Sequence, residues 1–129
     1  MVFGTFDGIH EGHLDFFRQA REYGDYLIAV AGRDVNIEKI KGRLPKYKDK
    51  ERLEYLKKCP LVDKAMLGYK NDPYKRIEEV KPDVICIGYD QNSFNINLDT
   101  KLKELGLNAD IYILKAHRPD QFKSSIINK

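Results

Sequence analysis

Short apolar runs alternate with amphipathic stretches along the whole chain. Five of the runs are apolar enough to form buried strands, and they cover residues 1–3, 26–32, 64–68, 84–88 and 110–114. Parallel strands that are covered on both faces have such continuous apolar runs, and helices connect them. The pattern therefore predicts an α/β fold, in which residues 1–129 form a single Rossmann-like domain with a five-stranded parallel sheet and helices on both faces.

The stretches between these runs have helical spacing. Apolar residues recur three and four positions apart, and glycine or proline marks the ends. We expect helices from Leu14 to a stop at Gly24, over residues 48–58, from Pro73 to just before Lys81, and over residues 98–106. Residues 35–48 are basic and irregular, which predicts a mobile loop, and the serines of the closing KSSIINK can cap one final helical turn.

Composition narrows the classes of function. The chain is 42% apolar and 33% charged, as globular proteins are, and its formal charge of +3 is spread out rather than gathered into a nucleic-acid-binding arm. No apolar run approaches the roughly 18–20 residues that span a bilayer, and the start of the chain lacks a signal-peptide pattern. Cys59 and Cys86 lie in unlike contexts, which favours reduced thiols. We expect a cytoplasmic protein without nucleic-acid or membrane partners.

Three stretches rich in chemistry follow predicted strands. They are GTFDGIHEGH at residues 4–13, GRD at 32–34 and GYDQ at 88–91. In open parallel sheets, ligands bind in the crevice beyond the carboxyl ends of the strands. The topology is therefore expected to bring these three stretches together around a ligand.

The opening loop has three competing explanations. A histidine metal site is disfavoured, because His117 is the only other histidine and no cysteine lies near. A turn capped by histidine explains Gly8 but not His13, since a neutral serine or aspartate would cap a helix better. A phosphate cradle explains more: Gly4 and Gly12 clear the backbone, the helix start offers N–H groups, and the imidazoles can donate hydrogen bonds to oxyanions. The loop contains neither GxxxxGK[ST] nor a full GxGxxG.

GTFD followed by HxGH resembles the signature of the cytidylyltransferase-like nucleotidyltransferases. Further matches are GRD, the pair Glu51-Arg52, the V-D before the third strand, GYDQ and the final S-S-I. The resemblance implies a nucleotidyltransferase-type (HUP) fold and an enzyme that joins a phosphorylated substrate to a nucleoside monophosphate from CTP or ATP, releasing pyrophosphate.

Within that family, GYDQ and KSSII are most similar to the archaeal FAD synthases, which adenylate FMN. The bacterial glycerol-3-phosphate and ethanolamine-phosphate cytidylyltransferases usually end in R-[ST]-x-G-I-S-[ST]-[ST], whereas this chain has Lys123–Ile127 with Arg118 upstream. The resemblance therefore implies transfer of AMP from ATP to FMN. A cytidylyltransferase acting on glycerol 3-phosphate and a non-catalytic nucleotide-binding domain remain the alternatives. An intact HxGH disfavours the latter.

The resemblance also implies roles for individual residues. His10, His13 and Lys41 form the predicted catalytic set, with Lys41 as a second phosphate clamp or simply one lysine in a solvated run. The nucleotide is expected to contact Gly4, Thr5, Phe6, His10, Gly12, His13, Gly88, Asp90, His117, Ser124 and Ser125. Asp34 is the candidate for holding the acceptor, or a strand-end turn residue, and Asp7 is interpreted as a turn former outside the catalytic set.

The expected partners follow from the same resemblance. Mg²⁺ or another divalent cation would arrive with the nucleotide, with no protein metal site. A homodimer is expected because the family usually forms one. FMN requires a flat apolar slot, for which we expect walls from Ile37, Ile40 and Tyr47 and from the segment Phe94–Leu98.

Overall fold

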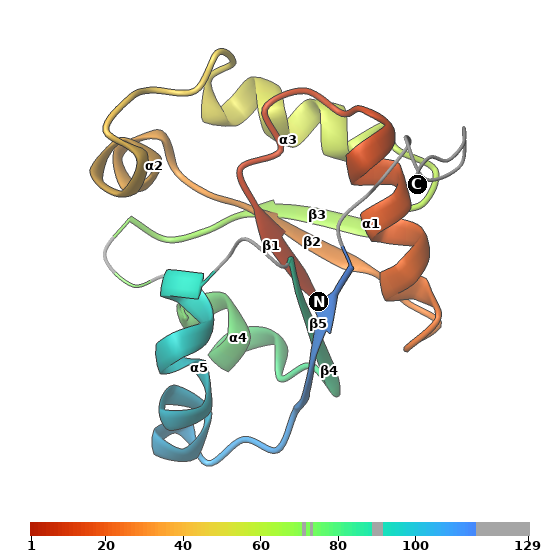
Figure 1. Cartoon of the computed structure of the whole chain (residues 1–129), viewed down its shortest axis with the longest axis vertical. Coiled ribbons are helices and arrows are strands. Elements are labelled where there is room, and N and C mark those ends of the chain that lie inside the picture. Colours follow the sequence, from red (N-terminus) through yellow and green to blue (C-terminus); the bar gives the residue numbers. More distant parts are fainter. Residues whose placement is uncertain (71, 73, 89–91, 116–129) are drawn as a thin grey trace, which may run out of the picture.

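Figure 1 shows a computed structural model that describes residues 1–70, 72, 74–88 and 92–115. Its sheet consists of β1 (Val2–Gly4), β2 (Ile28–Ala31), β3 (Lys64–Leu67), β4 (Val84–Gly88) and β5 (Asp110–Leu114). All described strand pairs are parallel, and the five strands lie in the order β3-β2-β1-β4-β5. The predicted five-stranded parallel sheet is confirmed.

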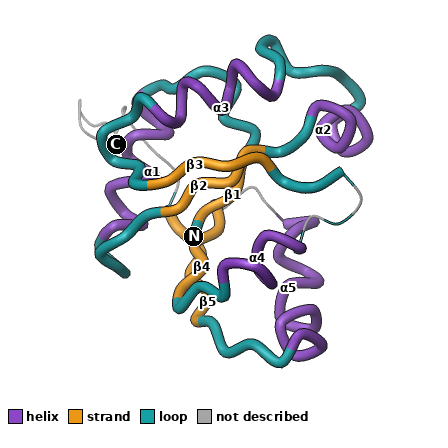
Figure 2. The backbone as a smooth tube through the Cα atoms, turned by 180° about the vertical axis from the view of Figure 1, so that it is seen from behind, coloured by secondary structure: helices purple, strands orange, loops and turns teal. Residues whose placement is uncertain are grey.

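Helices cover both faces of this sheet, as predicted. They are α1 (Glu11–Arg21), α2 (Asp34–Lys41), α3 (Asp49–Lys57), α4 (Lys75–Val80) and α5 (Asn92–Leu105). Side chains of α1 and α3, such as Phe17 and Leu56, pack on one face, and those of α4 and α5, such as Ile77 and Leu98, pack on the other. Figure 2 shows the two helix layers on either side of the strands. Alternate strand residues supply the two cores, since β-strand side chains point to opposite faces in turn.

One predicted loop and two predicted helix starts were wrong. The sequence predicts a mobile loop over residues 35–48, but residues 34–41 form α2, because tertiary contacts hold it: Ile37 is buried, and the Asn36 side-chain amide donates to the Tyr69 carbonyl at 3.1 Å. The first helix begins at Glu11 rather than Leu14, and the last begins at Asn92 rather than 98. Pro73, the predicted start of the fourth helix, lies outside the described residues, and α4 begins at Lys75.

The strand order reverses its direction at β1. From β1 the chain moves in one direction to β2 and β3, and then in the other direction to β4 and β5. Ligands bind at such a switch point, outside the carboxyl ends of the strands. Val2 pairs with Cys86, so Gly4 and Gly88 lie two residues further on at the same edge. The loop after β1 and the end of β4 therefore lie at the same edge of the sheet.

Candidate active site

The loop after β1 turns sharply at Phe6. Phe6 has a φ of 51°, in the left-handed region, and Gly8 has a φ of 88°. The Gly8 N–H donates to the Phe6 carbonyl at 3.0 Å. This turn folds the Phe6 side chain back under the loop, where only 3% of it is exposed and its ring lies 5.4 Å from the Phe17 ring.

The absence of a side chain at Gly4 makes room for that ring. A Cβ on Gly4 would lie 2.9 Å from Cζ of Phe6, closer than side chains tolerate. The sequence predicts that Gly4 clears space for a phosphate, whereas the neighbour that occupies this space is Phe6. The interior packing of the loop is therefore sufficient to require glycine at this position.

His10 and His13 cap the N-terminus of α1. His10 is the N-cap residue, and its Nδ1 accepts a hydrogen bond from the Gly12 N–H at 3.0 Å. In return, Nδ1 of His13 accepts from the His10 N–H at 3.3 Å. The histidine-capped turn, which the sequence favoured less than a phosphate cradle, is present and includes His13, because two imidazoles reproduce the reciprocal capping box.

This capping fixes the chemistry of the two imidazoles. Because Nδ1 of each ring accepts a hydrogen bond, the neutral ring carries its proton on Nε2, which is a donor. The ring centroids are only 3.9 Å apart. At His10, capping and phosphate binding are thus compatible, since they use different nitrogens of the ring, whereas the second nitrogen of His13 faces the Gly8 backbone.

His13 is neutral at physiological pH. Burial, and then the proximity of His10, lowers the pKa of His13 to about 4, although a hydrogen bond to the Gly8 backbone opposes this shift. Its ring also meets the Phe6 ring edge-on at 5.5 Å. A polyanion at this helix end would favour the protonated form, so the site can take up positive charge when it is filled.

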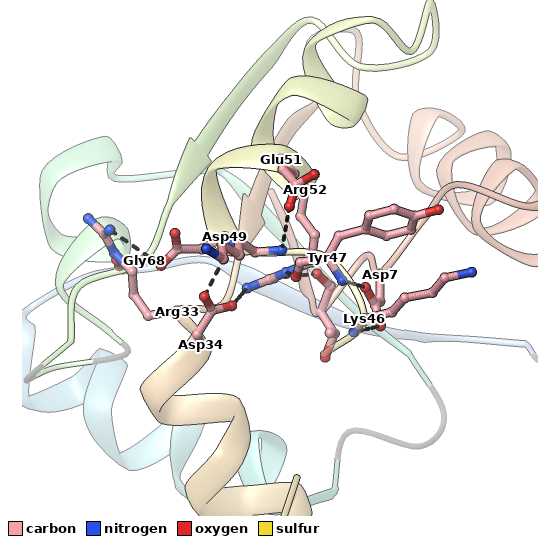
Figure 3. A network of polar contacts seen from close by, with 11 residues as sticks. Asp7, Arg33, Asp34, Lys46, Tyr47, Asp49, Glu51, Arg52 and Gly68 are labelled. Carbon is pink, nitrogen blue, oxygen red and sulfur yellow. Dashed lines mark hydrogen bonds and ion pairs between the residues drawn. The ribbon is translucent and has the colours of Figure 1, made fainter. Parts of the chain in front are cut away.

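Beneath the loop lies Arg52 of α3, a fully buried arginine at 0% exposure (Figure 3). Its Nη1 donates to the Thr5 carbonyl at 2.7 Å, and its Nε donates to the Tyr47 carbonyl at 3.0 Å. Its Nη2 forms an ion pair with Oδ1 of Asp34 at 2.7 Å. The guanidinium therefore connects the loop after β1, the start of α2 and the residues before α3.

Asp34, the predicted acceptor-binding residue, is part of this network. Besides Arg52, its carboxylate accepts a hydrogen bond from the Asp49 N–H at 3.3 Å. Both oxygens thus have protein partners at the carboxyl end of β2. These pairings give Asp34 a structural role, and its contact with the acceptor stays a prediction.

A second carboxylate, Asp7, holds the connection between α2 and α3. It accepts hydrogen bonds from the backbone N–H groups of Lys46 at 2.6 Å and Tyr47 at 2.8 Å (Figure 3). Burial would raise the pKa of Asp7, but these two donors lower it overall. The Tyr47 ring lies over Gly8, where a Cβ would be 3.4 Å from it. Residues 46 and 47, which the sequence places in a mobile loop, are therefore held by Asp7 next to the opening loop.

The carboxyl ends of β2 and β3 are also joined. Nε of Arg33 donates to the Gly68 carbonyl at 2.8 Å, and its Nη1 lies 3.7 Å from the Asp49 carboxylate. Arg33 is the residue directly before α2. These contacts hold α2 against the crevice edge on the side of the sheet away from β4.

The structure places only some of the other predicted residues. Gly88 ends β4 at the crevice, and Lys41 is the last residue of α2, with its side chain outside the described part. Asp90, His117, Ser124 and Ser125 lie outside the described residues. Within the described part, no cluster of three or more His, Cys, Asp or Glu could hold a metal ion. Over those same residues, no helix is long and apolar enough to cross a membrane.

Sequence reasoning missed Arg52 as a site residue. It entered only as part of a matching pair, Glu51-Arg52, without a role. A signal was present, because Arg52 lies four residues before Leu56, which is fully buried in the same helix. Residues four apart share a helix face, so an arginine on the apolar face of α3 indicates a buried partner.

Known proteins are similar to this chain over most of its length. Residues 1–129 match the cytidylyltransferase-like family. The FAD synthase of Thermoplasma acidophilum is 35% identical over 129 residues, which are 100% of this chain and 90% of that protein. The FAD synthase of Methanohalophilus mahii is 42% identical over 117 residues, covering 89% of this chain and 80% of that protein.

A solved structure extends the likeness to three dimensions. The lipopolysaccharide core biosynthesis protein from Thermoplasma volcanium GSS1 superposes with a TM-score of 0.84 at 33% identity, covering 92% of this chain and 96% of that one. The family predicted from GTFD and HxGH is thus confirmed over the whole chain. The chain belongs to the cytidylyltransferase-like family.

Proposed function

We propose that this protein is an FAD synthase, which transfers AMP from ATP to FMN and releases pyrophosphate. The observation that carries the proposal is the match, along essentially the whole chain, to curated archaeal FAD synthases. The capped histidine pair at the switch point of the sheet supports it, because it presents imidazole donors where a polyphosphate would lie.

The proposed reaction requires no protein nucleophile. A phosphate oxygen of FMN attacks the α-phosphorus of ATP, a new P–O bond forms, and the bond to the β-phosphate bridging oxygen breaks so that pyrophosphate leaves with the electron pair. The protein must align two polyanions and stabilise the negative charge that develops. In this proposal His10, His13 and the N–H groups of Thr5 and Phe6 perform this task, and Gly12 in the first turn of α1 leaves room for the phosphates.

The remaining predicted residues complete the proposed site. Gly88 and Asp90 would flank the base and ribose, and Ser124, Ser125, His117 and Lys41 would contact the nucleotide. A divalent cation such as Mg²⁺ would neutralise the leaving pyrophosphate and would enter with ATP.

The choice of FMN as the acceptor is supported mainly by the similarity to FAD synthases and less by the residues predicted to form a flat apolar slot. Of the expected walls, Ile37 and Leu98 are core side chains at 6% and 0% exposure. Tyr47 is half-buried beside the opening loop and remains the candidate contact for the flavin. We also propose that the protein is cytoplasmic, which agrees with the free thiols of Cys59 and Cys86. We propose that it forms a homodimer, and a measurement of its mass in solution at micromolar concentration tests this assembly.

The proposal is tested by measuring kcat/KM for two substrate pairs with Mg²⁺ on one preparation. FMN with ATP should yield FAD and pyrophosphate faster than glycerol 3-phosphate with CTP yields its CDP derivative. Faster CMP transfer would replace the FAD assignment with a cytidylyltransferase. ATP binding without pyrophosphate release from either pair would indicate a domain that binds nucleotide without catalysis.

A further inference from the structure

The Thr5–Phe6 peptide has an orientation that one buried side chain sets. Arg52 holds the Thr5 carbonyl at 2.7 Å from inside the protein. We propose that Arg52 is a positioning residue for catalysis: by binding the Thr5 carbonyl it turns the Phe6 N–H toward the phosphates of the bound nucleotide. This inference rests on the proposed function for its substrate.

The geometry of a peptide bond carries the first step. The C=O of one residue and the N–H of the next are fixed to opposite sides of a planar trans peptide. The described residues contain no cis peptide bond. Because the Thr5 carbonyl points inward to Arg52, the Phe6 N–H points outward, toward the crevice side of the loop.

The backbone conformation of Phe6 carries the second step. Phe6 and Lys81 are the two non-glycine residues with positive φ among those the structure describes. Such a conformation persists only where its surroundings enforce it. At Phe6 the enforcing contacts are Arg52 on the carbonyl before it and the burial of its ring between His13 and Phe17.

The rigidity of Arg52 carries the third step. Three of its nitrogens have separate acceptors on three segments, the carbonyls of Thr5 and Tyr47 and the carboxylate of Asp34 (Figure 3). A planar guanidinium bound in this way cannot rotate without losing a charge-assisted hydrogen bond. Lysine, with a single nitrogen on a flexible stem, cannot replace all three contacts.

These contacts give Asp34 an indirect part. Its Oδ1 holds Arg52, and its Oδ2 accepts from the first residue of α3, Asp49. The start of α2 is thereby coupled to the opening loop through one arginine. Since the guanidinium is buried away from water, the coupling is expected to survive moderate salt.

The test compares Arg52→Lys with a matched control, Arg21→Lys. Nη1 of Arg21 binds the Leu61 carbonyl at 3.0 Å and the Asp63 carboxylate at 2.8 Å, near the amino end of β3. Arg21 therefore binds a carbonyl and an aspartate as Arg52 does. Its partners, however, lie at the amino ends of the strands, and the opening loop lies at their carboxyl ends. Each variant is assayed well below its own Tm for kcat and for KM of ATP, and its Phe6 amide is followed by ¹⁵N NMR during ATP addition.

We expect Arg52→Lys to lower kcat about 10–100-fold with a smaller change in KM, as expected for partial loss of a transition-state donor. The ATP-induced shift of the Phe6 amide should shrink in Arg52→Lys and remain in Arg21→Lys, which should keep kcat within about twofold. An equal shift and an unchanged kcat in Arg52→Lys would overturn the inference.

The unsubstituted protein provides a second readout in case Arg52→Lys does not fold. If ATP leaves its Phe6 amide unmoved while FAD is still formed, the positioning role is refuted and the proposed function stands. If ATP moves the amide but no FAD forms from FMN and ATP, the proposed function fails and the orientation of the Phe6 N–H toward the nucleotide phosphates stands.

Discussion

Replacing Gly4 by alanine tests the packing that shapes the opening loop. The new Cβ would lie 2.9 Å from Cζ of Phe6 and 3.1 Å from its Cε1. The Phe6 ring cannot easily move away, because it is 3% exposed and packs against the Phe17 and His13 rings. One of these rings, or the β1 backbone, must shift to accommodate a single methyl group.

The magnitude follows from the crowding. Overpacking a core costs about 1–3 kcal/mol, and the lower unfolded-state entropy of alanine offsets about 0.4–1 kcal/mol of this. A net loss of about 1–2 kcal/mol remains. For a chain of 129 residues the entropy of unfolding is about 0.27 kcal/mol per kelvin, so Tm should fall by about 4–7 °C.

The assay is thermal unfolding of Gly4→Ala, Phe6→Leu and the double variant. Leucine removes the colliding ring atoms, so the double variant should be more stable than the sum of the two losses predicts, with a coupling of about 1–2 kcal/mol. Gly24→Ala is the matched control, because a Cβ there meets no heavy atom within 4 Å. It should leave Tm unchanged or slightly raised.

Activity separates the two reasons for a glycine at this position. If Gly4 only accommodates the Phe6 ring, the double variant should regain turnover relative to Gly4→Ala as it regains stability. Recovery of stability without turnover would mean that the bound phosphate also needs the space. An unchanged Tm in Gly4→Ala, or strictly additive losses, would refute the packing explanation.

Three further substitutions or titrations test the site. His10→Asn keeps an acceptor for the Gly12 N–H but lacks Nε2–H, so Tm should hold while kcat falls about 10²–10³-fold; a fall in Tm with unchanged kcat would leave His10 only as a cap. His13 should titrate by NMR near its lowered pKa of about 4 in the free protein, and higher with ATP bound. Because the unfolded chain binds that proton below about pH 6.5, the His13 contribution to stability should be complete above that pH and lost as the pH falls toward 4; a pKa of 6.5 in the free protein would contradict this. Asp7→Ala should speed hydrogen exchange of the Tyr47 amide about 5–10-fold, because the lost hydrogen bond contributes about 1 kcal/mol. Unchanged exchange would mean that Asp7 does not hold this segment.

The positions of most elements follow from local pattern alone. Continuous apolar runs at residues 84–88 and 110–114 became β4 and β5, because a strand buried on both faces has few polar positions. The same local rule failed at 34–41, where no strong amphipathic pattern exists. There α2 is held by contacts with residues of the β3 edge, such as Tyr69, more than thirty positions away.

The sequence by itself determined the family and the residue types of the opening loop, since GTFD and HxGH both lie within residues 4–13 and are recognised without a structure. Tertiary structure decided how those residues are used. It placed β1 beside β4, packed the Phe6 ring over Gly4 and paired Asp34 with Arg52. Arg52 and Thr5 are 47 positions apart. Periodicity records which side chains are buried, but a hydrogen bond between distant segments depends on how the whole sheet assembles.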